Sequence, residues 1–267
     1  QHAAWLGLVL AVATPWLVAT SLRVDLANAG YRSVGVRWRG GVRDSLNVFW
    51  PFVAFAVLTL IFPLEFDGMS WGREQWNGLI PTLVLALLYP WFIAAYRLML
   101  LGRSCYGNAN LSTRASIRNV YAIYLRATVL ALVLAVPASI CTALLVILVK
   151  SRSIDPTAIL HWSTQALFIL GLLPWAAVIL VLYAYTQSRV ANVTISASRF
   201  TVPPVPPAVA GSEVRLRSAL RMRALVKLYL LNLLAVLATA GLAIPWAAVR
   251  SARVRADATT LVTLGSL

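Results

Sequence analysis

The chain has 267 residues, of which 60% are hydrophobic and only 12% are charged, and its net charge is +15. A soluble domain needs a polar surface around its core, and about a quarter of its residues are usually charged. The composition therefore excludes a soluble monomer. It also argues against a nucleic-acid partner, because a nucleic-acid-binding protein can be as basic but is far less apolar.

Stretches without any charged residue recur along the chain, at residues 1–22, 45–64, 75–96, 127–149, 156–188 and 228–249. Each has about 20 residues or more, which at 1.5 Å per residue crosses a hydrocarbon core of roughly 30 Å. We predict an all-α polytopic membrane protein with about six transmembrane helices. Residues 1–267 would then form a single integral membrane domain.

The basic residues lie in alternate loops. Residues 23–44, 97–126 and 189–227 hold 17 of the 23 lysines and arginines. The segment 65–74 carries three acidic residues against one arginine, and the segment 150–155 is short. Cytoplasmic loops of membrane proteins are enriched in Lys and Arg. We therefore expect the three arginine-rich loops in the cytoplasm and the other two loops outside.

The tail fits this rule less well, because Arg250, Arg253 and Arg255 follow the sixth apolar stretch. One interpretation is an ordinary sixth span that leaves these arginines outside, and the pattern favours it. The alternative is a re-entrant hairpin, broken near Gly241, that returns them to the cytoplasm. Accessibility of residues 251–260 would separate the two.

The dipeptide Pro-Trp occurs four times, whereas chance predicts roughly half of one occurrence, and this excess indicates an internal repeat. The four pairs are Pro15-Trp16, Pro90-Trp91, Pro174-Trp175 and Pro245-Trp246. A second motif, Arg-x-x-x-Arg, precedes the second, fourth and sixth apolar stretches. Its copies are Arg39 with Arg43, Arg114 with Arg118, and Arg217 with Arg221. Together the motifs divide the chain into units of roughly 1–44, 45–118, 119–227 and 228–267.

Arginines four residues apart share one face of a helix, so each Arg-x-x-x-Arg pair predicts a basic helix start at the headgroup level. One interpretation is contact with anionic lipid headgroups or with a protein partner. The other is that these arginines only set the orientation and snorkel to the interface.

Short polar stretches between the spans alternate in part, as strands do: Tyr31–Trp38, Val190–Val202 and, more weakly, Asn108–Thr113. They predict short β-strand-like segments that form a small cytoplasmic sheet. The stretch Pro203–Pro207 is predicted to be a stiff extended insert.

Groups for catalysis are sparse. The two histidines, His2 and His161, are far apart, and Cys105 and Cys141 are too few for a metal site. Asp25 and Asp44 lie among arginines and are predicted to pair with them. We expect no metal, no cofactor and no enzymatic activity.

The segment from Leu228 to Arg255 resembles the YjgN-like family of bacterial inner-membrane proteins. The matching residues are Asn232, Thr239, Gly241, Pro245, Trp246, Ala247, Arg250 and Arg253, whereas Val254 replaces a tyrosine of the family. Tyr31–Trp38 is also similar to the family's short glycine-containing strand. The resemblance implies a multi-pass protein of the bacterial inner membrane, but it does not indicate an activity, because the family is a domain of unknown function. It further implies a protein partner, for which it suggests a membrane zinc metalloprotease.

Two functions remain open. The first is a non-enzymatic scaffold or adaptor that binds another membrane or envelope protein, favoured by the basic loops and the absent catalytic groups. The alternative is a transporter or channel for a lipid or small solute, favoured by the repeats and by prolines that kink apolar helices.

Overall fold

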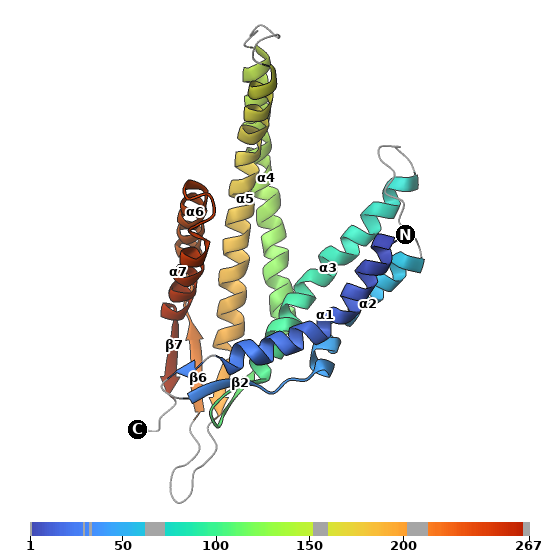
Figure 1. Ribbon diagram of the computed structural model, residues 1–267. Helices are drawn as coiled ribbons and strands as arrows, with labels where there is room; N and C mark the ends of the chain where they lie inside the picture. The colour runs from blue at the N-terminus through green and yellow to red at the C-terminus, as the bar shows by residue number, and fades with distance from the viewer. Residues whose placement is uncertain are drawn as a thin grey trace, which may run out of the picture. The chain divides into compact units, whose positions relative to one another are not determined.

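The computed structural model describes residues 2–28, 30–31, 34–61, 73–151, 160–201 and 213–263. These residues are mostly helical, with short strands between the helices (Figure 1). The elements are α1 (His2–Ala27), β1 (Gly30–Tyr31), β2 (Val34–Trp38), α2 (Val42–Ile61), α3 (Arg73–Gly102), β3 (Ser104–Tyr106), β4 (Ala109–Thr113), α4 (Ile117–Ser151), α5 (Leu160–Ser196), β5 (Ser198–Thr201), β6 (Glu213–Ser218), α6 (Met222–Ala238), α7 (Ile244–Asp257) and β7 (Thr259–Thr263).

Four described helices are long and apolar enough to cross a membrane. The segments are Val9–Ala27, Thr82–Gly102, Ile117–Ile147 and Leu170–Ser196. They overlap the first, third, fourth and fifth predicted spans, so four of the six predicted spans are helices that could cross a membrane by length and composition. The second predicted span lies in α2, which is not among the four. The predicted outer loops at 65–74 and 150–155 fall largely outside the described residues, and Pro203–Pro207 falls wholly outside them.

The prediction of an ordinary sixth span is wrong. Residues 228–249 belong to two shorter helices, α6 and α7, joined by a turn at residues 239–243. Ala240 and Gly241 both take positive φ angles, of 48° and 97°, and glycine adopts such angles at little steric cost. The N–H of Gly241 donates to the carbonyl of Val236 at 2.8 Å, which closes the end of α6. The chain therefore reverses at Gly241, as the hairpin alternative requires.

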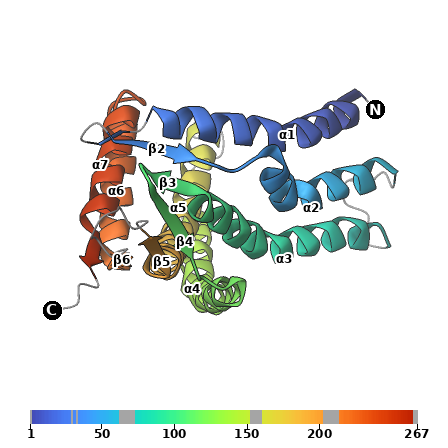
Figure 2. The same ribbon diagram turned by 90° about the horizontal axis from the view of Figure 1, so that it is seen from below.

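The strands form a seven-stranded sheet in the order β1 to β7, so each strand pairs with its neighbour in the chain. All pairs from β1 to β6 are antiparallel. Figure 2 shows β2 to β6 following one another across this sheet. The strand predicted at 108–113 is confirmed as β4. The single strand predicted at 31–38 is confirmed only for Val34–Trp38, which is β2, because Tyr31 belongs to a separate strand, β1, that pairs antiparallel with β2. The prediction for 190–202 is wrong in its first half, because residues up to Ser196 continue α5 and the strand begins at Ser198.

The chain divides into two compact units. Residues 1–121, 193–217 and 260–267 form the first unit, which holds α1, α2, α3 and nearly all of the sheet. Its core packs Trp38 of β2 against Ala19, Val48 and Met99 of the three helices. Burial of these apolar surfaces fixes β2 against the helices that precede and follow it.

Residues 122–192 and 218–259 form the second unit, which holds most of α4 and α5 together with α6 and α7. Its core joins Ala184 of α5 to Leu225 and Leu228 of α6 and to Leu220, which precedes α6. This cluster fixes α6 against α5.

Candidate functional site

One face of the sheet collects arginines from strands that are far apart in the chain. Directly opposed residues in a sheet share a face. The register places Arg37 of β2 in one row with Cys105, Asn110, Thr201 and Glu213. The next row holds Ser112, Arg199 and Arg215.

Two further arginines extend these rows. Arg217 follows Arg215 by two residues in β6, so it lies on the same face. Arg39 follows Arg37 by two residues, and its Nη1 donates to Oδ1 of Asn110 on that face at 2.9 Å. We call the face that carries Arg37, Arg39, Arg199, Arg215 and Arg217 the arginine face.

Charge on the arginine face is poorly balanced. Arg199 and Arg215 stand directly opposite each other, an arrangement of like charges that destabilises a sheet. Glu213, the one carboxylate within the described strands, pairs with Arg199 at 3.1 Å. Arg37, Arg39, Arg215 and Arg217 are exposed. An anionic ligand would therefore find several unbalanced guanidinium groups in one place.

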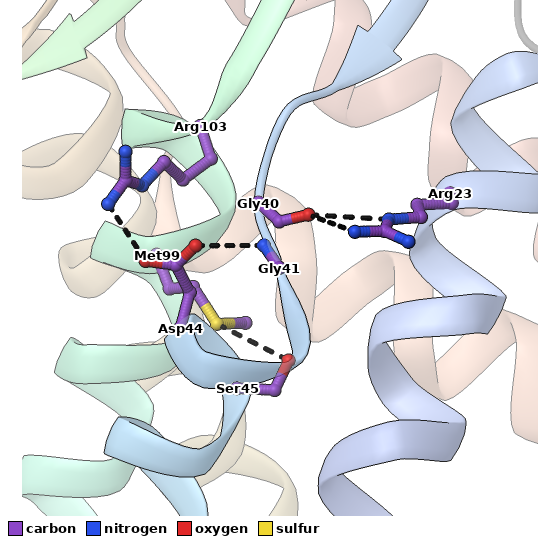
Figure 3. Close-up of polar contacts among 7 residues, drawn as sticks. All are labelled: Arg23, Gly40, Gly41, Asp44, Ser45, Met99 and Arg103. Carbon is purple, nitrogen blue, oxygen red and sulfur yellow. Dashed lines mark hydrogen bonds and ion pairs between the residues drawn. The ribbon is translucent and has the colours of Figure 1, made fainter.

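The start of α2 beside this face is held by a polar cluster (Figure 3). Arg23 of α1 donates from Nε and Nη2 to the carbonyl of Gly40, at 3.3 and 3.0 Å. Asp44 accepts from the N–H of Gly41 at 2.8 Å and pairs through its other oxygen with Arg103 at 2.8 Å. These contacts join α1, α2 and α3 at the point where the chain leaves the sheet.

The prediction that acidic residues pair with arginine is thus confirmed for Asp44. Asp25 instead accepts a hydrogen bond from the Ser21 hydroxyl at 3.1 Å. Within the described part of the chain both ion pairs belong to other carboxylates, Asp44 and Glu213. The Asp44–Arg103 pair links the first turn of α2 to the residue that follows α3, so we assign it a structural role.

The six arginines predicted as contact residues, Arg39, Arg43, Arg114, Arg118, Arg217 and Arg221, are all exposed. The prediction that each pair shares one helix face is wrong. Arg39 and Arg114 precede α2 and α4, and Arg217 lies in β6. In each case a short link separates the strand from the helix. Only Arg43 and Arg118 therefore lie within helices, and Arg221 directly precedes α6. The structure brings Arg39 and Arg217 together on the arginine face and leaves the other four near helix starts.

The Pro-Trp pairs lie in the helices that lead into strands. Pro15 and Pro90 are buried inside α1 and α3, and Pro174 lies inside α5. Pro245 differs, because it stands in the first turn of α7, where its missing N–H has no helical partner to lose. The four tryptophans, Trp16, Trp91, Trp175 and Trp246, are all at least partly exposed.

Sequence reasoning missed Arg37, Arg199 and Arg215. The alternation Arg215-Leu216-Arg217 is a strand signal that could have revealed Arg215, and Arg37 precedes Arg39 by the same spacing. Arg199 carries no such signal, because its place on the face depends on the pairing of β5 with β4 and β6.

A second feature lies within the second unit. α4 and α5 line an open, shallow apolar groove of about 210 Å³, with Pro137 and Cys141 on one side and Pro174 on the other. The other cysteine, Cys105, is buried in β3, where its thiol donates to the carbonyl of Arg37 at 3.3 Å. Among the described residues no three His, Cys, Asp or Glu side chains come together as a metal site would require.

Comparison with known proteins gives one match. A family model described as a bacterial protein of unknown function (DUF898) matches residues 2–267. This match is consistent with the YjgN-like resemblance of the sequence. No curated protein and no solved structure matches the chain.

Proposed function

The chain belongs to the DUF898 family of bacterial proteins of unknown function, and from its own geometry we propose that it is a non-enzymatic membrane scaffold or adaptor. The arginine face is the observation that carries this proposal. It gathers five arginines and one carboxylate, contributed by β2 and the residue after it, β5 and β6, on one face of the seven-stranded sheet. Electrostatic complementarity of this kind selects and orients a partner. The partner is another membrane or envelope protein with an exposed acidic segment, and the family resemblance suggests a membrane zinc metalloprotease.

The proposed location is the bacterial inner membrane, with the sheet and the arginine-rich loops in the cytoplasm and the whole chain acting as one membrane domain. The surface of α4 supports the membrane placement, because large apolar side chains such as Leu125, Leu132 and Val136 are more than 60% exposed. A helix that is apolar on all sides belongs in hydrocarbon. The location of 17 of 23 basic residues in alternate loops supports the orientation.

An internal repeat is part of the proposal. The order helix, two strands, helix occurs from α1 to α2, from α3 to α4 and from α5 to α6. Pro15, Pro90 and Pro245 each lie 12 residues before the last residue of their helix. Such a repeat explains how strands from distant parts of the chain meet in one sheet. Each copy of the repeat contributes two strands between its two helices.

The helix starts have a separate proposed role. Arg43, Arg118 and Arg221 lie where apolar helices begin, which is the level of the lipid headgroups in the proposed orientation. Guanidinium groups at this level bind anionic headgroups. The arginine face then remains available for the protein partner.

Purification of the tagged protein in mild detergent tests the scaffold. We expect a stoichiometric protein partner, lost in the double variant Arg215→Glu/Arg217→Glu. The matched control Arg223→Glu/Arg253→Glu changes the same number of exposed charges outside the arginine face and should keep the partner. No stoichiometric partner, or equal loss in both variants, would contradict the proposal.

A transporter or channel is the second candidate, and the open apolar groove between α4 and α5 favours it. Its lining is apolar and includes two helix-interior prolines, Pro137 and Pro174. A lipid or other apolar solute would suit that lining. Uptake or lipid flipping by the purified protein in vesicles, in the absence of any partner, would support this candidate over the scaffold.

A further inference from the structure

The α6–α7 hairpin is closed along its length by specific contacts. Asn232 of α6 is 8% exposed, and its Nδ2 donates to the carbonyl of Ala247 at 3.3 Å and to Oγ of Ser251 at 3.0 Å. Nearer the base, Arg255 donates from Nη2 to the hydroxyl of Tyr229 at 3.1 Å. The two helices are therefore in antiparallel register from base to turn (Figure 1).

Both ends of the hairpin are held at one level. The N–H of Ala219, before α6, donates to the carbonyl of Ala258, after α7, at 2.9 Å. Asn192 of α5 binds the same link, accepting from the N–H of Leu220 at 2.9 Å and donating to its carbonyl at 3.0 Å. β6 before the hairpin and β7 after it are neighbours in the sheet. A segment whose two ends meet in this way enters and leaves on the same side.

A contact with α5 measures how far the hairpin reaches. The rings of Tyr183 and Tyr229 lie 5.2 Å apart, so they mark one level on α5 and α6. From Tyr183, α5 continues 23 residues to Leu160, which is roughly 35 Å of helix. From Tyr229, α6 continues only nine residues to Ala238, which is roughly 14 Å. A hydrocarbon core is roughly 30 Å thick. From the level of the two tyrosines, α5 is therefore long enough to cross such a core, whereas α6 reaches only about halfway across it.

The turn between α6 and α7 is apolar and exposed. Leu237, Leu242 and Ile244 are 68%, 86% and 59% exposed. No charged residue lies between Lys227 and Arg250, and Arg250 itself stacks on the Trp246 ring at 5.1 Å. Arginine and tryptophan together are typical of the boundary between headgroups and hydrocarbon. Large leucine and isoleucine side chains beyond that boundary need an apolar environment.

We infer that α6 and α7 form a re-entrant hairpin that enters the membrane from the cytoplasmic side and ends among the acyl chains of that leaflet. The inference rests on the proposed membrane placement of α5 but not on the protein partner. It places Arg250, Arg253 and Arg255 at the cytoplasmic face, so the tail obeys the same charge rule as the three basic loops.

Cysteine labelling in cells tests the inference. Cys141→Ser with Cys105→Ser gives the background, and if that double variant fails to fold, the native cysteines are kept and their signal subtracted. Ala256→Cys, exposed at the base of α7, should react with a membrane-impermeant maleimide only after the inner membrane is opened. Asn108→Cys in the β3–β4 turn is the cytoplasmic control, and Ser70→Cys in the predicted outer loop should react in intact cells. Reaction of Ala256→Cys in intact cells would overturn the hairpin.

The depth of the hairpin tip in the membrane is tested by spin labelling of the protein in vesicles of phosphatidylethanolamine and phosphatidylglycerol. A nitroxide on Leu242→Cys should be relaxed more by oxygen than by a water-soluble nickel chelate, and a nitroxide on Ala256→Cys should show the reverse. Stronger relaxation of Leu242→Cys by nickel would place the tip in water. Weak relaxation by both would mean that protein, not acyl chains, covers the tip, and either result overturns the inference. None of these readouts depends on whether a partner co-purifies, so the scaffold proposal stands or falls separately.

Discussion

A methyl group added at Gly40 should destabilise the first unit. A Cβ at this position would lie 2.7 Å from Cη2 of Trp38 and closer still to two other atoms of the indole. Trp38 is 5% exposed and belongs to the core with Ala19, Val48 and Met99. The ring is large and rigid, so Gly40→Ala forces either the indole or the backbone at residue 40 to move. Movement of the backbone would also strain the hydrogen bonds from Arg23 to the Gly40 carbonyl.

Overpacking of a well-packed core costs about 1–3 kcal/mol. Because the clash involves several ring atoms rather than one flexible chain end, we expect about 2 kcal/mol for Gly40→Ala. For a domain of this size such a loss lowers the Tm by roughly 4–8 °C.

Gly41→Ala is the matched control. The nearest atoms to a Cβ at Gly41 are the backbone N of Arg43 at 3.9 Å and Oδ2 of Asp44 at 4.0 Å, which are ordinary contacts. We therefore expect Gly41→Ala to stay within about 0.5 kcal/mol of the parent protein.

The assay follows the thiol of Cys105 during heating in detergent, in a Cys141→Ser background. Cys105 is 2% exposed and pairs with Arg37 of β2, so it reacts with a fluorogenic maleimide only when this part of the sheet opens. Gly40→Ala should expose it at a lower temperature than Gly41→Ala. Equal transitions for the two variants, or no shift in Gly40→Ala, would refute the packing argument.

Three further predictions concern polar contacts. Asp44→Ala removes the acceptor of the Gly41 N–H and the partner of Arg103, so it should cost about 1–2 kcal/mol in the same thermal assay, whereas Asp25→Ala should be nearly neutral. Asn192→Ala leaves both backbone groups of Leu220 without their side-chain partner and should cost about 1–3 kcal/mol, followed as the Tm of the purified protein; a neutral result would mean that water replaces the amide. Arg43→Glu/Arg118→Glu should lower the phosphatidylglycerol retained during purification, measured by lipid mass spectrometry, and unchanged retention would reject headgroup binding at the helix starts.

The apolar helices could be predicted well because exclusion of charge from hydrocarbon leaves a direct mark on the sequence. The strand at Val34–Trp38 could also be predicted from its alternation. The ordinary span predicted at residues 228–249 is wrong because hydropathy depends only on composition, and composition does not show where the chain reverses. The reversal depends on positive φ angles at Ala240 and Gly241, and the first of these residues gives no hint of it.

Two other predictions, the helix start at Arg217 and the strand at residues 190–196, are wrong for the same reason. Each rests on a local sequence pattern and ignores the segments that pack against it in the fold. The spacing of Arg217 and Arg221 suits a helix, yet Arg217 pairs within the sheet, where the Thr260 hydroxyl donates to its carbonyl at 3.5 Å. The β-branched residues Val193, Thr194 and Ile195 suit a strand, yet they complete the last turns of α5. Tertiary pairing overrides such propensities. The arginine face could not be predicted as a whole, because it exists only once the register of β2, β5 and β6 is known.

The central claim is that the arginine face binds another protein, and photo-crosslinking in living cells tests it most directly. A photoreactive amino acid at Ser112 or Thr201, both exposed on that face, leaves all five arginines intact. The control position is Leu132, which is 67% exposed on the apolar surface of α4. The account predicts one discrete protein adduct from each of Ser112 and Thr201, lost in Arg215→Glu/Arg217→Glu, and none from Leu132. Absence of an adduct from both face positions, or an adduct that survives the charge reversal, would contradict it.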